Sequence, residues 1–168
     1  QVIFSHSKAQ ENEYLEQLFK EKEWFECERF PVFLPQNMID IKKESSGKNK
    51  LLEQKIAQLQ KTWRGIERNY FQVVKEFHHK KLLLRYICHI SRFGPEGEYC
   101  RPNKLFVRLR TKRDERRAIE TIGHELLHLL FADFFKLKRF NYFEREGMVD
   151  SLILETGLVK LFPKYEKQ

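Results

Sequence analysis

Apolar residues recur in steps of four and three between residues 50 and 79, which is the longest regular pattern in the chain. Because residues three and four apart share one face of an α-helix, this spacing predicts a single long amphipathic helix. Such a stripe can form the seam of a coiled coil. Its bulky aromatic members favour instead a helix that packs against the back of a sheet. The stripe consists of Leu52, Ile56, Leu59, Trp63, Ile66, Tyr70, Val73 and Phe77.

Two segments with the composition of β-strands follow. Residues 81–90 are rich in apolar and aromatic side chains, and the glycines and proline of residues 93–98 predict a turn. Residues 103–110 then alternate, which indicates a strand with one apolar face. The apolar face holds Leu105, Val107 and Leu109, and the other holds Lys104, Phe106, Arg108 and Arg110. We therefore expect a small mixed or antiparallel sheet in an α+β fold.

The C-terminal part of the chain indicates two further helices. The first is expected to begin near Asp114, a suitable cap, and to carry an apolar stripe from Ile119 to Leu130. Residues 132–141 should turn the chain. The second helix is predicted over residues 142–160, with Gly157 as its stop or bend. Residues 163–168 are expected to form a loose tail.

The N-terminal part is less regular. A short strand is predicted at residues 2–4, an amphipathic helix at 9–23, and a linker at 45–49. With 168 residues the chain fits one domain. We expect a single domain over residues 1–168, divided into an N-terminal extension of unknown role at 1–48 and a core at 49–168. One hypothesis is that the extension or the tail covers a cleft and keeps it latent.

Composition is that of a soluble globular protein, with 41% hydrophobic and 33% charged residues. No apolar run approaches the length of a membrane span, and no secretory signal is visible, so we expect a cytoplasmic protein. The odd number of cysteines favours a reducing compartment and plain thiols, with a bridge between the last two as the alternative. The three are Cys27, Cys88 and Cys100.

The net charge of +8 is concentrated in one stretch of the chain. Residues 51–113 carry 15 basic and 5 acidic side chains. A solvated basic face explains this excess most simply. Two functional interpretations are a preference for acidic peptide segments and nucleic-acid binding through phosphate contacts, although no zinc-finger or helix-turn-helix signature supports the latter. The sequence leaves the oligomeric state open.

The motif with the clearest chemical meaning is His124-Glu125-Leu126-Leu127-His128. Histidines at positions i and i+4 lie on one face of a helix, so both imidazoles can bind one metal ion. The glutamate between them lies beside the metal, where it can take a proton from water. The alternative is a helix whose polar face carries two histidines and a glutamate by coincidence.

The third ligand can be narrowed by elimination. A catalytic zinc takes three protein ligands and keeps one position open. The chain holds no His or Cys after His128, and Asp133 lies on the wrong side of its helix. On the following helix, Glu146 and Asp150 are the two acids on an otherwise apolar face, together with Phe143, Val149 and Ile153. We expect Glu146 as third ligand and Asp150 as a support for a histidine. A buried salt bridge remains the alternative.

The spacing of these residues resembles a known family. His124-Glu125-x-x-His128, 17 intervening residues and Glu146-x-x-x-Asp150 resemble the gluzincin metallopeptidases, in particular the compact minigluzincins. Residues 117–123 and 144–146 are also similar to the ImmA/IrrE-type metallopeptidases. The resemblance covers about residues 81–160. It implies a zincin-like core at 49–168, one Zn²⁺ held by His124, His128 and Glu146, and Glu125 as general base. No Tyr or His can be assigned to stabilise a transition state.

We therefore expect a zinc-dependent metalloendopeptidase that hydrolyses a peptide or protein substrate. In zincin-like folds the strand before the motif helix typically forms the rim of the cleft, and its free edge can pair with an extended peptide. This predicts Phe106, Arg108 and Arg110 as rim residues. One alternative is a regulatory protease or sensor of the ImmA/IrrE type that cleaves a single partner. Another is a non-catalytic binding module with a degenerate metal site.

Overall fold

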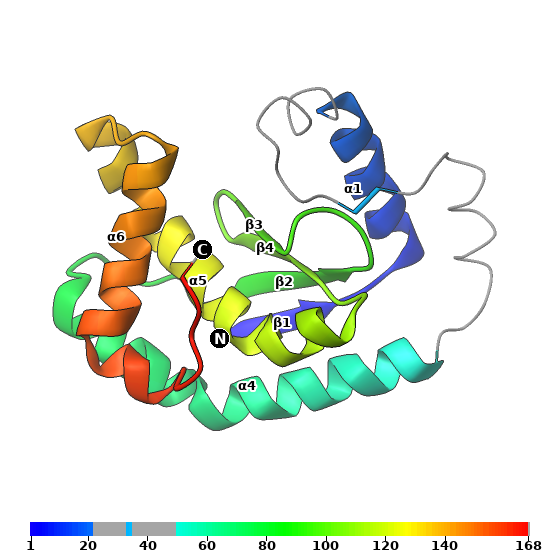
Figure 1. The fold of residues 1–168 in the computed structure, drawn as a ribbon, viewed down its shortest axis with the longest axis horizontal. Helices are drawn as coiled ribbons and strands as arrows, with labels where there is room; N and C mark the ends of the chain where they lie inside the picture. The colour runs from blue at the N-terminus through cyan, green and yellow to red at the C-terminus, as the bar shows by residue number, and fades with distance from the viewer. Residues whose placement is uncertain (22–32, 35–49, 168) are drawn as a thin grey trace.

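A small mixed sheet forms the centre of the molecule (Figure 1). The computed structural model describes residues 1–21, 33–34 and 50–167. In this part, four strands lie in the order β1 (Val2–Ser5), β2 (Tyr86–Ser91), β4 (Lys104–Arg108) and β3 (Gly97–Cys100). β1 pairs in parallel with β2, β2 pairs in parallel with β4, and β3 pairs antiparallel with β4. The expected α+β class with a small mixed sheet is confirmed.

The long amphipathic stripe forms helix α4, Lys50–Phe77. Figure 1 shows it running along one side of the molecule. Its apolar face is buried within the chain's own core, which also contains residues of the sheet, α5 and α6. The predicted backing helix is therefore confirmed, and the stripe cannot serve as an exposed coiled-coil seam. The buried residues of α4 are Leu52, Leu59, Trp63, Tyr70 and Val74.

Two helices follow the sheet. α5 spans Lys112–Lys138 and is longer than predicted, because it continues through residues that were expected to turn the chain. α6 spans Tyr142–Glu155 and gives way to the short 3₁₀ helix η1, Gly157–Lys160. The expected bend at Gly157 is thus confirmed. α5 contacts β3, β4, α4 and α6, so it lies at the centre of the apolar core.

The N-terminal segment is part of the fold rather than an extension of it. β1 is an edge strand of the sheet, and Val2 belongs to the main core. Helix α1 (Lys8–Lys20) covers the sheet face opposite α5, because Tyr14 stacks on Phe106 while the neighbouring residues of β4 point into the main core. The division at residue 48 is wrong for this segment. The predicted linker itself lies outside the described residues.

β3 was not predicted, and its presence changes the rim of the sheet. The turn expected at residues 93–98 already enters this strand at Gly97. Among the described strands, β4 is consequently paired on both sides, and β3 is the edge strand on that side of the sheet. The expectation of a free edge along residues 103–110 is therefore wrong. The apolar alternation of that segment is confirmed, since Leu105, Val107 and Leu109 are buried.

Among the described residues, no helix combines the length and the apolar character that a bilayer span requires. Cys88 is a buried free thiol and Cys100 an exposed one, so the two do not form the alternative bridge. Burial raises the pKa of the Cys88 thiol, which keeps it protonated. Cys27 lies outside the described residues.

Candidate metal centre

Helix α5 carries the two motif histidines and the glutamate in its buried middle. The helix was expected to begin near Asp114, but it begins at Lys112. Thr111 is the N-cap, and its hydroxyl accepts a hydrogen bond from the backbone N–H of Asp114. The Asp114 carboxylate accepts in return from the Thr111 N–H, which completes a capping box. Asp114 is thus the third residue of the first turn rather than the cap. His124, Glu125 and His128 are all buried.

Helix α6 brings the two predicted acids to the same place. Asn141 caps this helix, and Glu146 and Asp150 face α5 from successive turns. Val149 and Ile153 are buried on the same side, as predicted from their positions on one face of the helix. Phe143 does not follow that prediction, because its side chain is 82% exposed at the start of the helix.

Three side chains converge on one point. Nε2 of His124 lies 2.9 Å from Nε2 of His128 and 2.9 Å from Oε2 of Glu146. Nε2 of His128 lies 3.2 Å from Oε1 of Glu146. Ligand atoms about 2.0–2.1 Å from a tetrahedral zinc are separated by roughly 3.3 Å. The three donors therefore have nearly the spacing of a zinc ligand set, and they are the His/Glu cluster that the described residues offer to a metal.

The protonation of these groups fits a metal site. Burial lowers the pKa of His128, which favours the neutral imidazole that a metal requires. Burial by itself would raise the pKa of Glu146, but its close contacts with the imidazoles of His124 and His128 outweigh it and lower the pKa to about 2. Glu146 is thus a carboxylate, and one carboxylate with two imidazole nitrogens is a donor set that suits zinc.

Glu125 is buried beside the cluster and lies under strand β3. Burial raises its pKa well above the usual value, and the negative charges of Glu146, Glu98 and Glu96 add to the effect. A Cβ atom on Gly97 would lie 2.6 Å from Oε1 of Glu125, so only glycine lets the strand approach this closely. The carboxyl group is therefore held between α5 and strand β3.

One tyrosine contacts the cluster, and a second lies one helical turn from it. The ring of Tyr99 on β3 stacks on the imidazole of His128 at 5.4 Å and nearly parallel. Tyr142 precedes Glu146 by one turn of α6. Burial raises its pKa to about 12, with smaller contributions from the charges of Glu146 and Glu125. Its phenol is therefore protonated at neutral pH.

The C-terminal residues are docked on α5 and do not form the expected loose tail. Phe162 is 1% exposed and fills the space above Gly123, where a Cβ atom would lie 2.5 Å from its ring. The Tyr165 hydroxyl lies 2.6 Å from Nδ1 of His124 and donates to Oδ1 of Asp150, also at 2.6 Å. Oδ1 of Asp150 is 3.9 Å from Nδ1 of His124, which is too far for the expected direct hydrogen bond. The Tyr165 hydroxyl lies between the two groups and contacts both.

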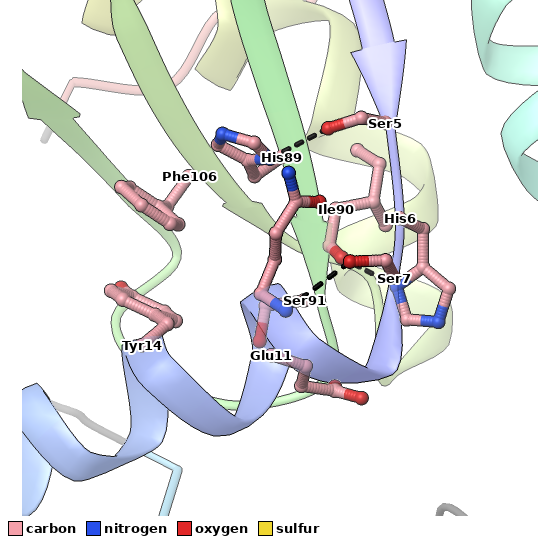
Figure 2. A pocket seen from close by; sticks show the side chains of 10 residues that line it. Ser5, His6, Ser7, Glu11, Tyr14, His89, Ile90, Ser91 and Phe106 are labelled. Carbon is pink, nitrogen blue, oxygen red and sulfur yellow. Dashed lines mark hydrogen bonds between the residues drawn. The ribbon is translucent and has the colours of Figure 1, made fainter.

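Two of the three predicted rim residues, Phe106 and Arg108, lie on the other face of the sheet, and Arg110 follows the end of β4. Phe106 stacks on Tyr14 and on His89, and it lines a small pocket between α1 and the ends of β1 and β2 (Figure 2). The Arg108 guanidinium is buried and donates to Asp114 and to the carbonyl of Gly94. Arg110 lies over the ring of Phe93. None of these side chains lies at the free edge next to the histidines, and the rim prediction is wrong.

The sequence pattern thus predicted the three candidate metal ligands, but it did not predict the roles of Gly97, Tyr99 and Tyr165. The signal for Tyr165 was present, because Phe162 and Tyr165 are two aromatic residues three positions apart in an otherwise polar segment. Gly97 and Tyr99 were hidden by the glycines and proline around them, which resemble a turn.

Comparison of the chain with protein-family models, with curated proteins and with solved structures finds no match.

Proposed function

We propose that this protein is a zinc-dependent peptidase with a zincin-like fold, in which His124, His128 and Glu146 hold the metal. The observation that carries the proposal is the approach of two imidazole nitrogens and one carboxylate to within 3.2 Å of one another in a buried place. Buried ionisable groups of this kind are rare unless they are paired or bind a metal. A bound zinc supplies a Lewis acid that polarises a carbonyl group and makes a water molecule more acidic.

Glu125 is the residue that transfers a proton from water to the leaving amine. It follows His124 directly on α5, and its carboxyl group is buried with a raised pKa. A carboxyl group held beside the reacting water can both accept a proton from it and return it to the leaving amine. Glu125 therefore acts first as general base and then as general acid.

The free edge of β3 is a suitable place for an extended peptide. β3 is paired only with β4 among the described strands, and it passes directly over Glu125 and His128 through Gly97 and Tyr99. A peptide added to this edge would form main-chain hydrogen bonds with β3 while its backbone runs beside the candidate metal ligands. β3 thus takes the role that the sequence assigned to residues 103–110.

Two substitutions test the proposal. Glu125→Gln should retain zinc and lose hydrolysis by about 10²–10⁴-fold, because the amide cannot accept the proton. Glu146→Ala should lose both zinc and hydrolysis. The measurements are the zinc content of the purified protein and the cleavage of a mixed peptide library, followed by mass spectrometry.

Glu155→Gln is a matched control, since Glu155 is an exposed acid at the other end of α6. It should behave like the wild type in both measurements. Wild-type hydrolysis by Glu125→Gln would contradict the role of this residue. A wild-type protein that takes up no zinc or other transition metal would contradict the proposed function as a whole.

A further inference from the structure

The C-terminal segment reaches the candidate metal centre and is anchored on both sides of the residue that touches it. Before Tyr165, the Phe162 ring is buried against Gly123. After it, the side chain of Arg117 donates to the backbone carbonyl of Glu166 at 3.2 Å. The position of the Tyr165 hydroxyl is thus fixed by packing and hydrogen bonding on either side, and not by His124 alone.

The hydrogen bonds of this hydroxyl define the state of the His124 ring. A tyrosine hydroxyl has one proton to donate, and Tyr165 donates it to the Asp150 carboxylate. The 2.6 Å contact with Nδ1 of His124 then requires the imidazole to donate and the tyrosine oxygen to accept. The ring proton is therefore on Nδ1. In a neutral imidazole this leaves the lone pair of Nε2, and Nε2 is the atom that faces His128 and Glu146.

We propose that Tyr165 is a positioning residue of the metal centre, which links Asp150 to His124 and holds the imidazole in the tautomer whose Nε2 can bind a metal. The inference rests on the proposed function, because it assigns the purpose of this tautomer to metal binding. Asp150 cannot take this role directly, since its nearer oxygen is 3.9 Å from Nδ1. The C-terminal segment is thereby a working part of the site.

The test uses the full chain with Tyr165→Phe, which removes the hydroxyl and retains the ring. Zinc affinity, measured by competition with a chromophoric chelator, should fall about 10- to 100-fold, as is typical when the partner of a ligand histidine is lost. Long-range ¹H–¹⁵N NMR of the metal-free protein should show His124 with its proton on Nδ1 in the wild type, and a loss of this preference in the variant.

Two further variants separate positioning from packing. Tyr70→Phe removes a buried hydroxyl that donates to the carbonyl of Gly123, directly before His124. It should lower stability and leave zinc affinity unchanged. Adding Asp150→Glu to Tyr165→Phe lengthens the carboxylate by about 1.5 Å, one carbon–carbon bond. The longer side chain can reach Nδ1 directly and should restore part of the lost affinity.

The outcomes are distinct. Wild-type zinc affinity in Tyr165→Phe, or a fall in affinity with an unchanged tautomer, would overturn the inference while the proposed function stands. If the wild type binds no zinc, the proposed function fails. The His124 tautomer of the metal-free protein then still tests whether Tyr165 positions the imidazole. A Nδ1 proton that depends on Tyr165 would support its positioning role, and one that does not would overturn it.

Discussion

The position of the Glu125 carboxyl group depends on Gly97, a residue with no side chain. A carboxyl group beside a metal centre must be close to the substrate and still be held in one orientation. Glu125 is confined because Gly97 of β3 lies against its Cγ and Oε1 atoms, and because Thr121 occupies the next turn of α5 beneath the same glycine. The contact joins two residues that are distant in sequence. It makes the free edge of the sheet and the proposed base a single structural unit.

Gly97→Ala should therefore damage the site. The added methyl group would lie 2.5 Å from Cγ2 of Thr121 and 2.6 Å from Oε1 of Glu125, so β3 or Glu125 must move. We expect stability to fall by about 1–3 kcal/mol, as for other overpacked positions. Hydrolysis should fall more than zinc affinity, because the metal ligands are not displaced. Urea unfolding, zinc competition and peptide cleavage measure the three effects.

Gly65→Ala is the control for this substitution. Nothing lies within 4 Å of a Cβ atom at Gly65, which is in the middle of α4. Replacing an open glycine in a helix by alanine should raise stability by up to about 1 kcal/mol. An alanine at position 97 that is tolerated as well as the one at position 65 would show that the close contact has no consequence.

At the scale of secondary structure elements, the junction between β4 and α5 sets the direction of the motif helix. Arg108 is the last residue of β4 and Asp114 lies in the first turn of α5. Their side chains form two hydrogen bonds, of 2.9 and 3.2 Å, and both are buried. The Asp114 carboxylate also accepts from the backbone of Arg110 and Thr111. One carboxylate thus caps the helix and ties it to the strand.

Removing the Asp114 carboxylate should lower the free energy of unfolding at neutral pH. Asp114→Ala leaves Arg108 buried without its partner, which typically costs about 3–5 kcal/mol. Asp133→Ala is the matched control, because Asp133 is 56% exposed in its ion pairs with Arg101 and Lys80. Exposed pairs contribute about 1 kcal/mol or less. Urea unfolding of both variants at pH 7 measures the difference.

The same pair predicts a pH dependence. Burial alone would raise the pKa of Asp114, but the hydrogen bonds from Arg108 and from the backbone outweigh it and lower the pKa below the usual value. The stabilisation is then fully present above the unfolded-state pKa of about 3.9 and is lost as the pH falls towards the lower folded-state value. The gap in stability between wild type and Asp114→Ala should shrink below about pH 4. An equally large gap at pH 3 and pH 7 would contradict this assignment.

At the scale of the whole molecule, the first residues complete the sheet that supports the site. Val2 is 4% exposed, and its backbone N–H donates to the Glu67 carboxylate of α4. The Ser5 hydroxyl lies 2.6 Å from Nδ1 of His89 on the neighbouring strand. β1 therefore connects the sheet to the backing helix. A latency test that deletes residues 1–48 would remove this strand together with any covering segment.

Removal of residues 1–5 alone should destabilise the protein. The deletion takes away a buried valine, worth about 1.5–3 kcal/mol, and leaves the hydrogen-bonding edge of β2 unpaired. We expect the free energy of unfolding to fall by at least about 2 kcal/mol in urea denaturation. Leu84→Ala, at a position that is 87% exposed, should change it by no more than about 0.5 kcal/mol. Equal effects of the two changes would show that β1 does not support the sheet.

The basic excess of residues 51–113 is also partly explained at this scale. Several of these side chains form ion pairs within the fold: Lys55 with Glu115, Arg108 with Asp114, and Arg101 with Asp133. Arg108 is paired with Asp114 and Arg110 lies over the ring of Phe93, so neither side chain supports a preference for acidic peptides at the candidate metal centre. Binding to nucleic acid stays a prediction, and its strength should fall steeply with salt if it occurs.

The sequence by itself determined the features that depend on neighbours along a helix. The spacing of His124 and His128, the side of α6 that carries Glu146 and Asp150, and the buried face of α4 all follow from 3.6 residues per turn. These features could be predicted because local geometry places the side chains whatever the rest of the chain does.

Only the tertiary structure decided which of the described strands lies at the edge beside the histidines, which residue touches Nδ1 of His124, and what confines Glu125. Each of these depends on contacts between segments that are far apart in sequence, such as Tyr165 with His124 and Gly97 with Glu125. Local periodicity contains no information on such contacts, because they are selected by how the apolar faces of strands, helices and the C-terminal segment fill one common core.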